Sequence, residues 1–237
     1  MRVDWQPAIV LHKRAYRETS LQLDILTQDY GVISLIARGV TGAKKHILRT
    51  QLQALQHLKI CYQQKSELGY LNQAELLSAP LMLDGERSMA GLYFNELVLK
   101  LCPKQDPDPE LFELLLRTRN VLEFDANLAW LVRRFERDLM IHLGYMAPWT
   151  FTAKGTSVNA DSYYRVHADL GIINALSNEP GVLRGQDIID FNEDGLPSPS
   201  SLLQWRQIMH QVISLHIGNT QPRSWQMISD LSRKTVK

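Results

Sequence analysis

The chain has 237 residues, of which 45% are hydrophobic, so it can bury a substantial core and is long enough for one large domain or two smaller ones. Its 26 lysines and arginines nearly balance its 25 aspartates and glutamates, which leaves a net charge of +1. The sequence holds no run of about 18 apolar residues and its start lacks the pattern of a secretory signal. We therefore expect a soluble cytoplasmic protein without a membrane partner.

The charge is distributed unevenly along the chain. Residues 1–66 carry ten Lys/Arg against four Asp/Glu, a net +6, whereas residues 67–144 carry eight against thirteen, a net −5. Between Asp29 and Glu67 there are six cations and not one acidic residue. This asymmetry favours a polyanionic partner for the N-terminal region. The same charges also fit an ordinary solvated surface.

Short alternating or apolar segments dominate the first eighty residues. The predicted strands are residues 8–12, 21–25, 32–36, 52–62 and 67–72. Five short strands with a basic connection between the third and the fourth indicate a small β-barrel of the OB type. Such barrels bind single-stranded nucleic acid by following its phosphates and stacking its bases. We expect this domain to cover residues 1–80.

The basic connection spans residues 37–49 and contains two glycines. Gly39 and Gly42 permit backbone conformations that other residues avoid, so the following cations can reach phosphate oxygens from a flexible loop. A phosphate-binding NTPase loop needs a different spacing, because here the glycines are three apart and the lysines precede His46. The sequence gives little support to an ATPase, and a solvated turn is the alternative.

From about residue 87 the hydrophobic period changes to three or four. The predicted helices are residues 89–101, 111–122, 128–143 and 198–217. The first ends before Pro103, the second follows Pro109, and the third ends at Gly144. These helices define a helical domain over residues 81–237.

Charged residues cluster on the third predicted helix. Arg133 and Arg137 are four residues apart and share one face, while Arg134 is placed to pair with Asp138. This pattern is compatible with an ordinary charged helix face. Two cations beside an apolar groove are equally suited to hold a carboxylate through charge-assisted bonds.

Four groups of residues stand out by their order and spacing. They are residues 8–11 (AIVL) with 18–21 (ETSL), 91–97 (GLYFNEL), 133–136 (RRFE), and 142–145 (HLGY). Together they resemble the bacterial RecO family of recombination mediators. The resemblance extends over most of the chain and is strongest in residues 1–50 and 88–146.

The resemblance implies an α+β multidomain fold, with an N-terminal OB-fold barrel, a helical domain, and no catalytic residues. A RecO-like protein would bind single- and double-stranded DNA, anneal complementary strands, and help RecR to load the RecA recombinase onto strands coated by single-strand-binding protein. It would also bind the Phe-ending C-terminal tail of that protein, with Arg133 of the RRFE motif at the tail carboxylate and its apolar surroundings around the phenylalanine. Arg137, on the same helix face, is the second residue that we expect at the tail. We expect it at the bacterial nucleoid.

The DNA contacts are expected on the basic N-terminal domain. The residues expected to make them are Arg14, Arg38, Lys44, Lys45, His46, Arg49 and Lys59. Because such binding depends mainly on phosphate charge, little base specificity is expected.

One segment departs from the family pattern. Many RecO-like proteins carry a four-cysteine zinc module after the third helix, but residues 146–185 contain no cysteine. We expect a small metal-free insert over residues 146–197, irregular in structure. Its expected core is Trp149, Phe151, Tyr163, Tyr164, Ile172 and Ile173. His167 and Asp169 are too few for a metal site, and Cys61 and Cys102 lack paired spacing, so we expect neither a metal nor a cofactor.

A second class of function fits the same fold. OB-folds also serve as protein-interaction scaffolds, in which case the basic loop would be plain surface without a direct DNA function. An enzyme is a third class with little support, since the sequence has no nucleophile elbow, zinc-protease motif or Walker lysine.

Overall fold

The computed structural model of the chain describes residues 1–40, 46–64, 67–218 and 221–225. It divides into two compact units. The barrel unit comprises Met1–Phe124 and the segment that begins at Pro222, and the second unit comprises Asp125–Gln221. The sequence-based boundary at residue 80 separates strands from helices, whereas the compact units group the first two long helices with the barrel.

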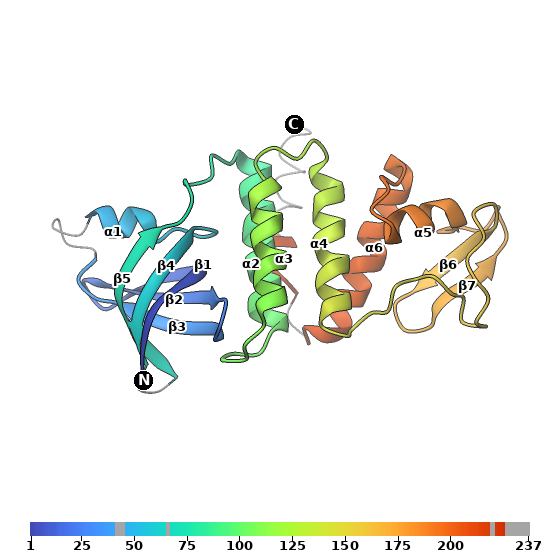
Figure 1. Cartoon of the computed structure of the whole chain (residues 1–237). Helices are drawn as coiled ribbons and strands as arrows, with labels where there is room; N and C mark the ends of the chain where they lie inside the picture. The colour runs from blue at the N-terminus through green and yellow to red at the C-terminus, as the bar shows by residue number, and fades with distance from the viewer. Residues whose placement is uncertain (41–45, 65–66, 219–220, 226–237) are drawn as a thin grey trace. The chain divides into compact units, whose positions relative to one another are not determined.

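Five strands of the barrel unit close into a barrel (Figure 1). They are β1 (Arg2–Tyr16), β2 (Ser20–Thr27), β3 (Gly31–Ala37), β4 (His57–Gln63) and β5 (Leu68–Leu76). Neighbours pair in the order β1-β2-β3-β5-β4, with β4 also beside β1, and the β3–β5 pair alone is parallel. This is the OB-type barrel that the sequence predicted.

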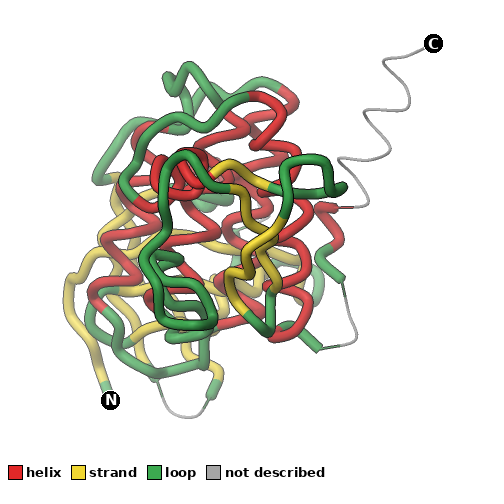
Figure 2. The backbone as a smooth tube through the Cα atoms, turned by 90° about the vertical axis from the view of Figure 1, so that its right-hand side faces the viewer, coloured by secondary structure: helices red, strands yellow, loops and turns green. Residues whose placement is uncertain are grey.

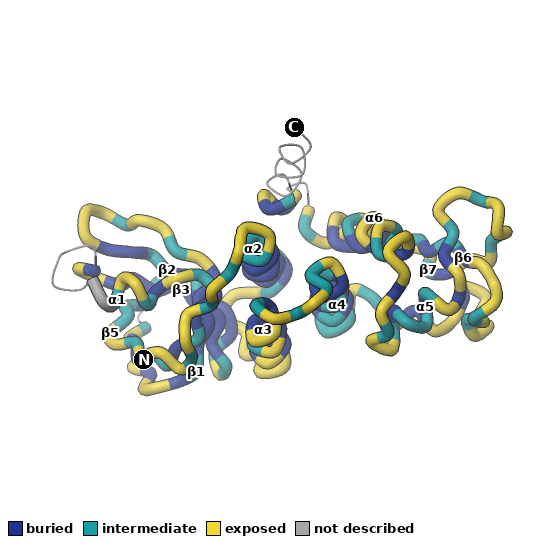
Figure 3. The backbone as a smooth tube through the Cα atoms, turned by 90° about the horizontal axis from the view of Figure 1, so that it is seen from above, coloured by how far each residue is buried: buried dark blue, intermediate teal, exposed yellow. Residues whose placement is uncertain are grey.

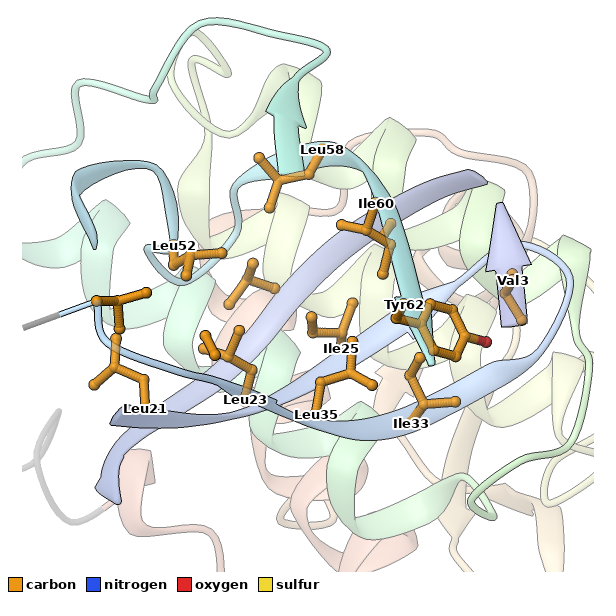
Figure 4. Close-up of a cluster of buried hydrophobic side chains, with 14 residues drawn as sticks. Val3, Leu21, Leu23, Ile25, Ile33, Leu35, Leu52, Leu58, Ile60 and Tyr62 are labelled. Atoms are coloured by element: carbon orange, nitrogen blue, oxygen red, sulfur yellow. The ribbon is translucent and has the colours of Figure 1, made fainter. Parts of the chain in front are cut away.

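Alternation along the strands builds the barrel interior. On β2, Leu21, Leu23 and Ile25 point into a shared apolar cluster, as Figure 4 shows, while the intervening Gln22 and Asp24 do not belong to it. Each fully buried leucine or isoleucine contributes about 1.5–3 kcal/mol relative to exposure. A one-residue slip in register would turn this whole set outward, so the pattern fixes the strand pairing.

The connection between the third and fourth strands differs from the expected flexible loop. Residues 46–51 form the short helix α1 (His46–Gln51). The fourth strand begins at His57 rather than at residue 52, because Leu55 has a positive φ of 65° that breaks extended structure before it. The fifth strand continues to Leu76, four residues beyond the prediction.

Two helices cover part of the barrel and follow the predicted pattern. They are α2 (Gly85–Leu101), capped by Asp84, and α3 (Pro109–Val121), capped by Asp108. Figure 3 shows dark-blue buried residues along α2, whereas α3 combines buried residues with a yellow, exposed flank. Asn95 on α2 donates its side-chain amide to the carbonyl oxygens of Val10, at 3.3 Å, and Leu11, at 2.8 Å.

The same α2 segment contacts the chain again near its end. The carboxylate of Glu96 accepts hydrogen bonds from the backbone N–H of Arg223, at 2.8 Å, and from the backbone N–H and hydroxyl of Ser224, at 3.1 and 2.7 Å. Trp225 lies against Tyr93, with ring centroids 6.4 Å apart. Residues 222–225, which follow the second unit in the chain, therefore pack against α2 of the barrel unit. We call these contacts the fastening.

We expect Glu96→Ala to release this fastening. Three hydrogen bonds to an ionised carboxylate are lost, so the barrel unit should lose about 1.5–3 kcal/mol, and a protease should cut the chain faster near residue 222. Thermal unfolding and limited proteolysis measure the two effects. The matched control is Glu113→Ala on the exposed face of α3, which should change stability by less than about 0.5 kcal/mol. Equal behaviour of the two variants would contradict the fastening.

The second unit combines three helices with a small sheet. Its elements are α4 (Leu128–His142), β6 (Tyr163–His167), β7 (Gly171–Ala175), β8 (Leu183–Arg184), α5 (Gly185–Asn192) and α6 (Pro199–His216). The sheet, in the order β7-β6-β8, faces the viewer in Figure 2 among long loops. The insert is thus more regular than expected, and its helix α5 was missed. Ser198 caps α6, where its side chain accepts a hydrogen bond from the backbone N–H of Ser201.

An aromatic cluster forms the core of the second unit. Phe191 and Trp205 stack with ring centroids 3.9 Å apart, and Trp149 stacks on Trp205 at 5.1 Å. Trp149, Tyr164 and Ile172 are buried as expected, but Phe151, Tyr163 and Ile173 are exposed. Tyr163 and Ile173 face solvent because alternate residues of a strand point to opposite faces of this small sheet, whereas Phe151 lies outside the sheet. The expected core of the insert was therefore wrong for half of its members.

The cysteines, the possible metal ligands and the helix hydropathy give no further candidate site among the described residues. Cys61 and Cys102 are free thiols, and burial raises the pKa of Cys102 to about 12. Over the residues that the structure describes, no three His, Cys, Asp or Glu side chains gather as metal ligands. None of the helices within those residues is long and apolar enough to cross a membrane.

Candidate nucleic-acid interface

Two of the expected DNA-binding residues share the outer face of the barrel. The register places Arg14 opposite Gln22 and Gln22 opposite Ile36. Arg14 donates from Nε and Nη2 to the side-chain oxygen of Gln22, at 3.2 and 2.9 Å. Arg38 follows Ile36 by two residues. Arg38 lies just beyond the end of β3 at Ala37 and lines the same groove as Ile36, the cross-strand partner of Gln22, so we group Arg14 and Arg38 on one face.

An open groove lies on this face and combines rings with cations. Its volume is about 750 Å³. Its lining includes Tyr16, Arg17, Glu18, Ile36, Arg38 and Tyr70. We call it the stacking groove. These residues come from the β1–β2 turn, the end of β3 and the start of β5, so the groove exists only when the barrel is closed.

The guanidinium groups of the stacking groove lie over aromatic rings. The Cζ atom of Arg38 is 3.9 Å from the ring centroid of Tyr70, and that of Arg17 is 5.3 Å from the ring centroid of Tyr16. Planar guanidinium and aromatic surfaces are the groups on which unpaired bases stack. Sequence reasoning missed Tyr16, Arg17 and Tyr70. A tyrosine followed by an arginine at a predicted turn was the available signal.

A second cationic cluster includes the short helix α1. Arg49 lies on α1, and Lys13 donates from Nζ to the side-chain oxygen of Gln53 just beyond that helix. The pKa of Lys13 is lowered by burial and, to a smaller extent, by the charge of Arg49. Lys13 therefore joins the expected Arg49 as a phosphate-binding candidate.

Three of the expected residues cannot be assigned to either cluster. Lys44 and Lys45 lie outside the described residues, and His46 begins α1 without a described side chain. Their DNA contacts stay predictions.

Lys59 lies on another part of the barrel. Its register partners are Pro7 on β1 and Glu75 on β5. Its Nζ atom is 2.8 Å from Oε2 of Glu75 and 5.0 Å from the ring centroid of Trp5. This ion pair compensates the positive charge for which Lys59 was expected to bind DNA. Its position on β4 does not bring Lys59 together with Arg14 and Arg38.

The expected carboxylate site on α4 is more deeply buried than the sequence indicated. The side chain of Arg133 is 7% exposed, and its Nη2 atom donates to Oε1 of the fully buried Glu136 at 2.8 Å. The other terminal nitrogen, Nη1, has no hydrogen-bond partner among the described residues. Arg133 thus has one terminal nitrogen paired with Glu136 and a second, buried one without a hydrogen-bond partner among the described residues.

Arg137 is engaged within the second unit. It donates to the carbonyl oxygen of Phe191, to Asp138 at 2.8 Å and to Asp194 at 2.6 Å. The expected pair between Arg134 and Asp138 is wrong: Arg134 instead contacts Asp194 at 3.4 Å. Asp194, at the end of α5, attracts both arginines because the insert folds back toward α4.

Arg133 and Arg206 both act on a histidine of α6. Burial lowers the pKa of His210 to about 3, and the charges of Arg133 and Arg206 add to the shift. His210 therefore stays neutral at physiological pH. Arg206 thus brings a second cation to the region of His210, while Glu136 pairs with the charge of Arg133.

Comparison with known proteins covers the whole described chain. Residues 1–80 match the family described as Recombination protein O N terminal, and residues 82–226 match Recombination protein O C terminal. The DNA repair protein RecO of Xanthomonas euvesicatoria pv. vesicatoria is 36% identical over 99% of this chain and 100% of its own length. The corresponding proteins of Stenotrophomonas maltophilia strain K279a and Xanthomonas campestris pv. campestris strain B100 are 36% and 34% identical over 98% and 99% of this chain, and over 99% of their own lengths.

These matches place both halves of the fold in one family. The two family regions meet at residue 81, between the last barrel strand and α2. Each relative is aligned over at least 99% of its own length. Both regions of this chain therefore match one and the same protein in each case. The chain belongs to the RecO family of DNA repair proteins.

Proposed function

We propose that this protein is a non-enzymatic mediator of DNA recombination. It binds single- and double-stranded DNA, anneals complementary strands and, together with RecR, helps to load RecA onto strands coated by single-strand-binding protein. It acts in the bacterial cytoplasm, at the nucleoid. The observation that carries the proposal is the outer barrel face, where Arg14 and Arg38 lie beside a groove lined by two tyrosines.

Charge neutralisation is the physical basis of the proposed activity. Cations such as Arg14, Arg38 and Arg49 replace condensed counterions on the phosphates, and the release of these ions drives binding. A strand whose charge is neutralised in this way repels its complement less, so two strands can approach and pair. No covalent step is required.

Recruitment to coated strands is assigned to the second unit. The tail of single-strand-binding protein ends in a carboxylate, and Nη1 of Arg133 is the donor that we propose for it. The choice is supported by Arg206, a second cation near His210, and by the lack of a hydrogen-bond partner for Nη1 among the described residues. Arg137 is the less suitable of the two expected contacts, because its donors already bind Phe191, Asp138 and Asp194.

Salt dependence tests the DNA-binding step. We expect the affinity for a single-stranded oligonucleotide to fall steeply with salt. Removing three cations, in Arg14→Ala/Arg38→Ala/Arg49→Ala, should lower the affinity at least about tenfold and reduce the slope of log K against log salt by about 2, which is roughly 0.7 for each lost phosphate contact. Fluorescence anisotropy over several salt concentrations measures both quantities.

The control is an exposed cation on α3. Arg117→Ala removes one charge from the same unit without touching the barrel face, so affinity and slope should stay close to those of the unaltered protein. A flat salt response, or equal losses in the triple variant and in Arg117→Ala, would contradict phosphate binding by this face. Retained protein partners without DNA affinity would instead indicate a scaffold.

A further inference from the structure

We propose that the stacking groove takes an unpaired base of single-stranded DNA and thereby makes the barrel unit prefer single strands to duplexes. This inference rests on the proposed DNA-binding function. It adds a ligand, a nucleobase face, to residues that charge alone would not select: Tyr16 and Tyr70.

The wall formed by Arg38 and Tyr70 is already stacked. At 3.9 Å from the ring centroid, the guanidinium lies in direct contact with the face of Tyr70. That contact restricts the side-chain freedom of Arg38 and holds the guanidinium over an aromatic surface. Arg38 can then stack a base on its plane and bind phosphate at its edge.

The β1–β2 turn adds a second ring and a second cation to the lining of the groove. Arg17, whose positive φ of 54° belongs to the tight turn, lies over Tyr16 at 5.3 Å. Ile36 adds an apolar side chain to the same lining. Two cation-covered rings and an aliphatic side chain offer a base apolar contact and offer positive charge for its phosphates.

The size and polarity of the groove suit a base with its sugar and phosphate. Its volume of about 750 Å³ falls within the roughly 300–1,000 Å³ of small-molecule pockets. Glu18 adds a carboxylate to the lining. The row formed by Arg14 and Gln22 continues the polar surface along the barrel face.

A duplex cannot use this groove without opening. Its bases are stacked on one another and show only their edges in the grooves of the helix, and extruding one costs a few kcal/mol. Phosphate contacts to Arg14 and Arg49 remain possible for either form of DNA. The binding free energy therefore has two contributions. Phosphate contacts are common to single strands and duplexes, whereas base stacking in the groove is available to single strands.

The experiment combines ring removal with base removal. Tyr16→Leu and Tyr70→Leu keep every charge and remove the rings, and Tyr16→Phe and Tyr70→Phe keep the rings. Each protein is titrated by anisotropy with a single-stranded oligonucleotide, the same oligonucleotide made fully abasic, and a duplex of equal length. Circular dichroism confirms that each variant is folded.

We expect each leucine variant to lose about tenfold in affinity for the normal single strand, and to bind the abasic strand and the duplex as the unaltered protein does. The phenylalanine variants should retain single-strand affinity. Unchanged single-strand affinity in both leucine variants, or equal losses on all three ligands, would overturn the stacking site. If the unaltered protein bound none of the three, the proposed function itself would fail instead.

Discussion

Arg119→Met is expected to destabilise the barrel unit by about 2–4 kcal/mol. The guanidinium of Arg119 is buried, with 3% of the residue exposed, and burial lowers its pKa. Its Nε donates to the carbonyl oxygen of Leu55 at 2.8 Å and its Nη2 to that of Ala79 at 2.9 Å. Methionine preserves the apolar stem but leaves both carbonyls without this donor, and each buried carbonyl without a donor costs about 1–3 kcal/mol.

The effect should be confined to the barrel unit. Leu55 holds the left-handed turn before β4, and its side chain packs so closely on Gly91 that a Cβ atom there would lie 2.2 Å from Leu55 Cδ1. Hydrogen exchange of β4 and α2 amides, read separately from the amides of α4 and α6, measures the loss by unit. The control is Arg117→Met, two residues away and exposed. Similar exchange rates in the two variants would show that the hydrogen bonds of Arg119 to Leu55 and Ala79 do not stabilise the barrel unit.

Strand alternation and helix breakers made most of the barrel unit predictable. Leu21, Leu23 and Ile25 alternate with polar residues, and Pro103 and Pro109 bracket the link between α2 and α3. Periodicity is a local property, and these elements obey it locally. The short helix α1 escaped because six residues contain too few turns to show a period.

The candidate sites were less predictable because their chemistry depends on distant neighbours. Lys59 is an available cation in the sequence, but Glu75, on a different strand, compensates it. Tyr16 and Tyr70 come together only through barrel closure. Arg137 was expected to bind a ligand, but it donates instead to the carbonyl oxygen of Phe191 and to the carboxylate of Asp194, both of which come from the insert.

The GLYFNEL segment illustrates how a recognisable motif can have a structural cause. Gly91 accommodates Leu55, Tyr93 contacts Trp225, Asn95 binds two carbonyls of β1, and Glu96 holds the segment that follows the second unit. Every one of these contacts lies within the barrel unit. The motif therefore joins three parts of the chain that are far apart in sequence.

Arg133→Met is expected to destabilise the second unit by about 3–5 kcal/mol. Glu136 is fully buried, and the guanidinium 2.8 Å away is the cation seen to compensate its charge. Removing one member of a buried ion pair costs more than the pair itself contributes, because the remaining charge stays in a medium of low polarity. Arg133→Met/Glu136→Leu should recover most of the loss. Hydrogen exchange of the α4 and α6 amides checks both variants.

The pH dependence gives this prediction a second, independent measure. Since the pKa of His210 in the folded protein is about 3, below the ordinary 6.5, its contribution to stability is complete above about pH 6.5 and is lost as the pH falls toward 3. Arg133 is one cause of the lowered pKa. Its removal should raise the pKa of His210 and make the acid-side loss shallower, a change that nuclear magnetic resonance titration of the imidazole can follow.

The neighbouring Arg134 supplies the control that separates folding from recognition. Its side chain is 38% exposed and paired with Asp194 at 3.4 Å, so Arg134→Met should cost less than about 1 kcal/mol. If Arg133→Met were equally mild, Glu136 could not be a buried carboxylate that depends on Arg133. If the double variant is stable yet fails to bind the tail peptide, Arg133 serves both the fold and the ligand. A stable double variant that still binds would assign the tail carboxylate to another cation.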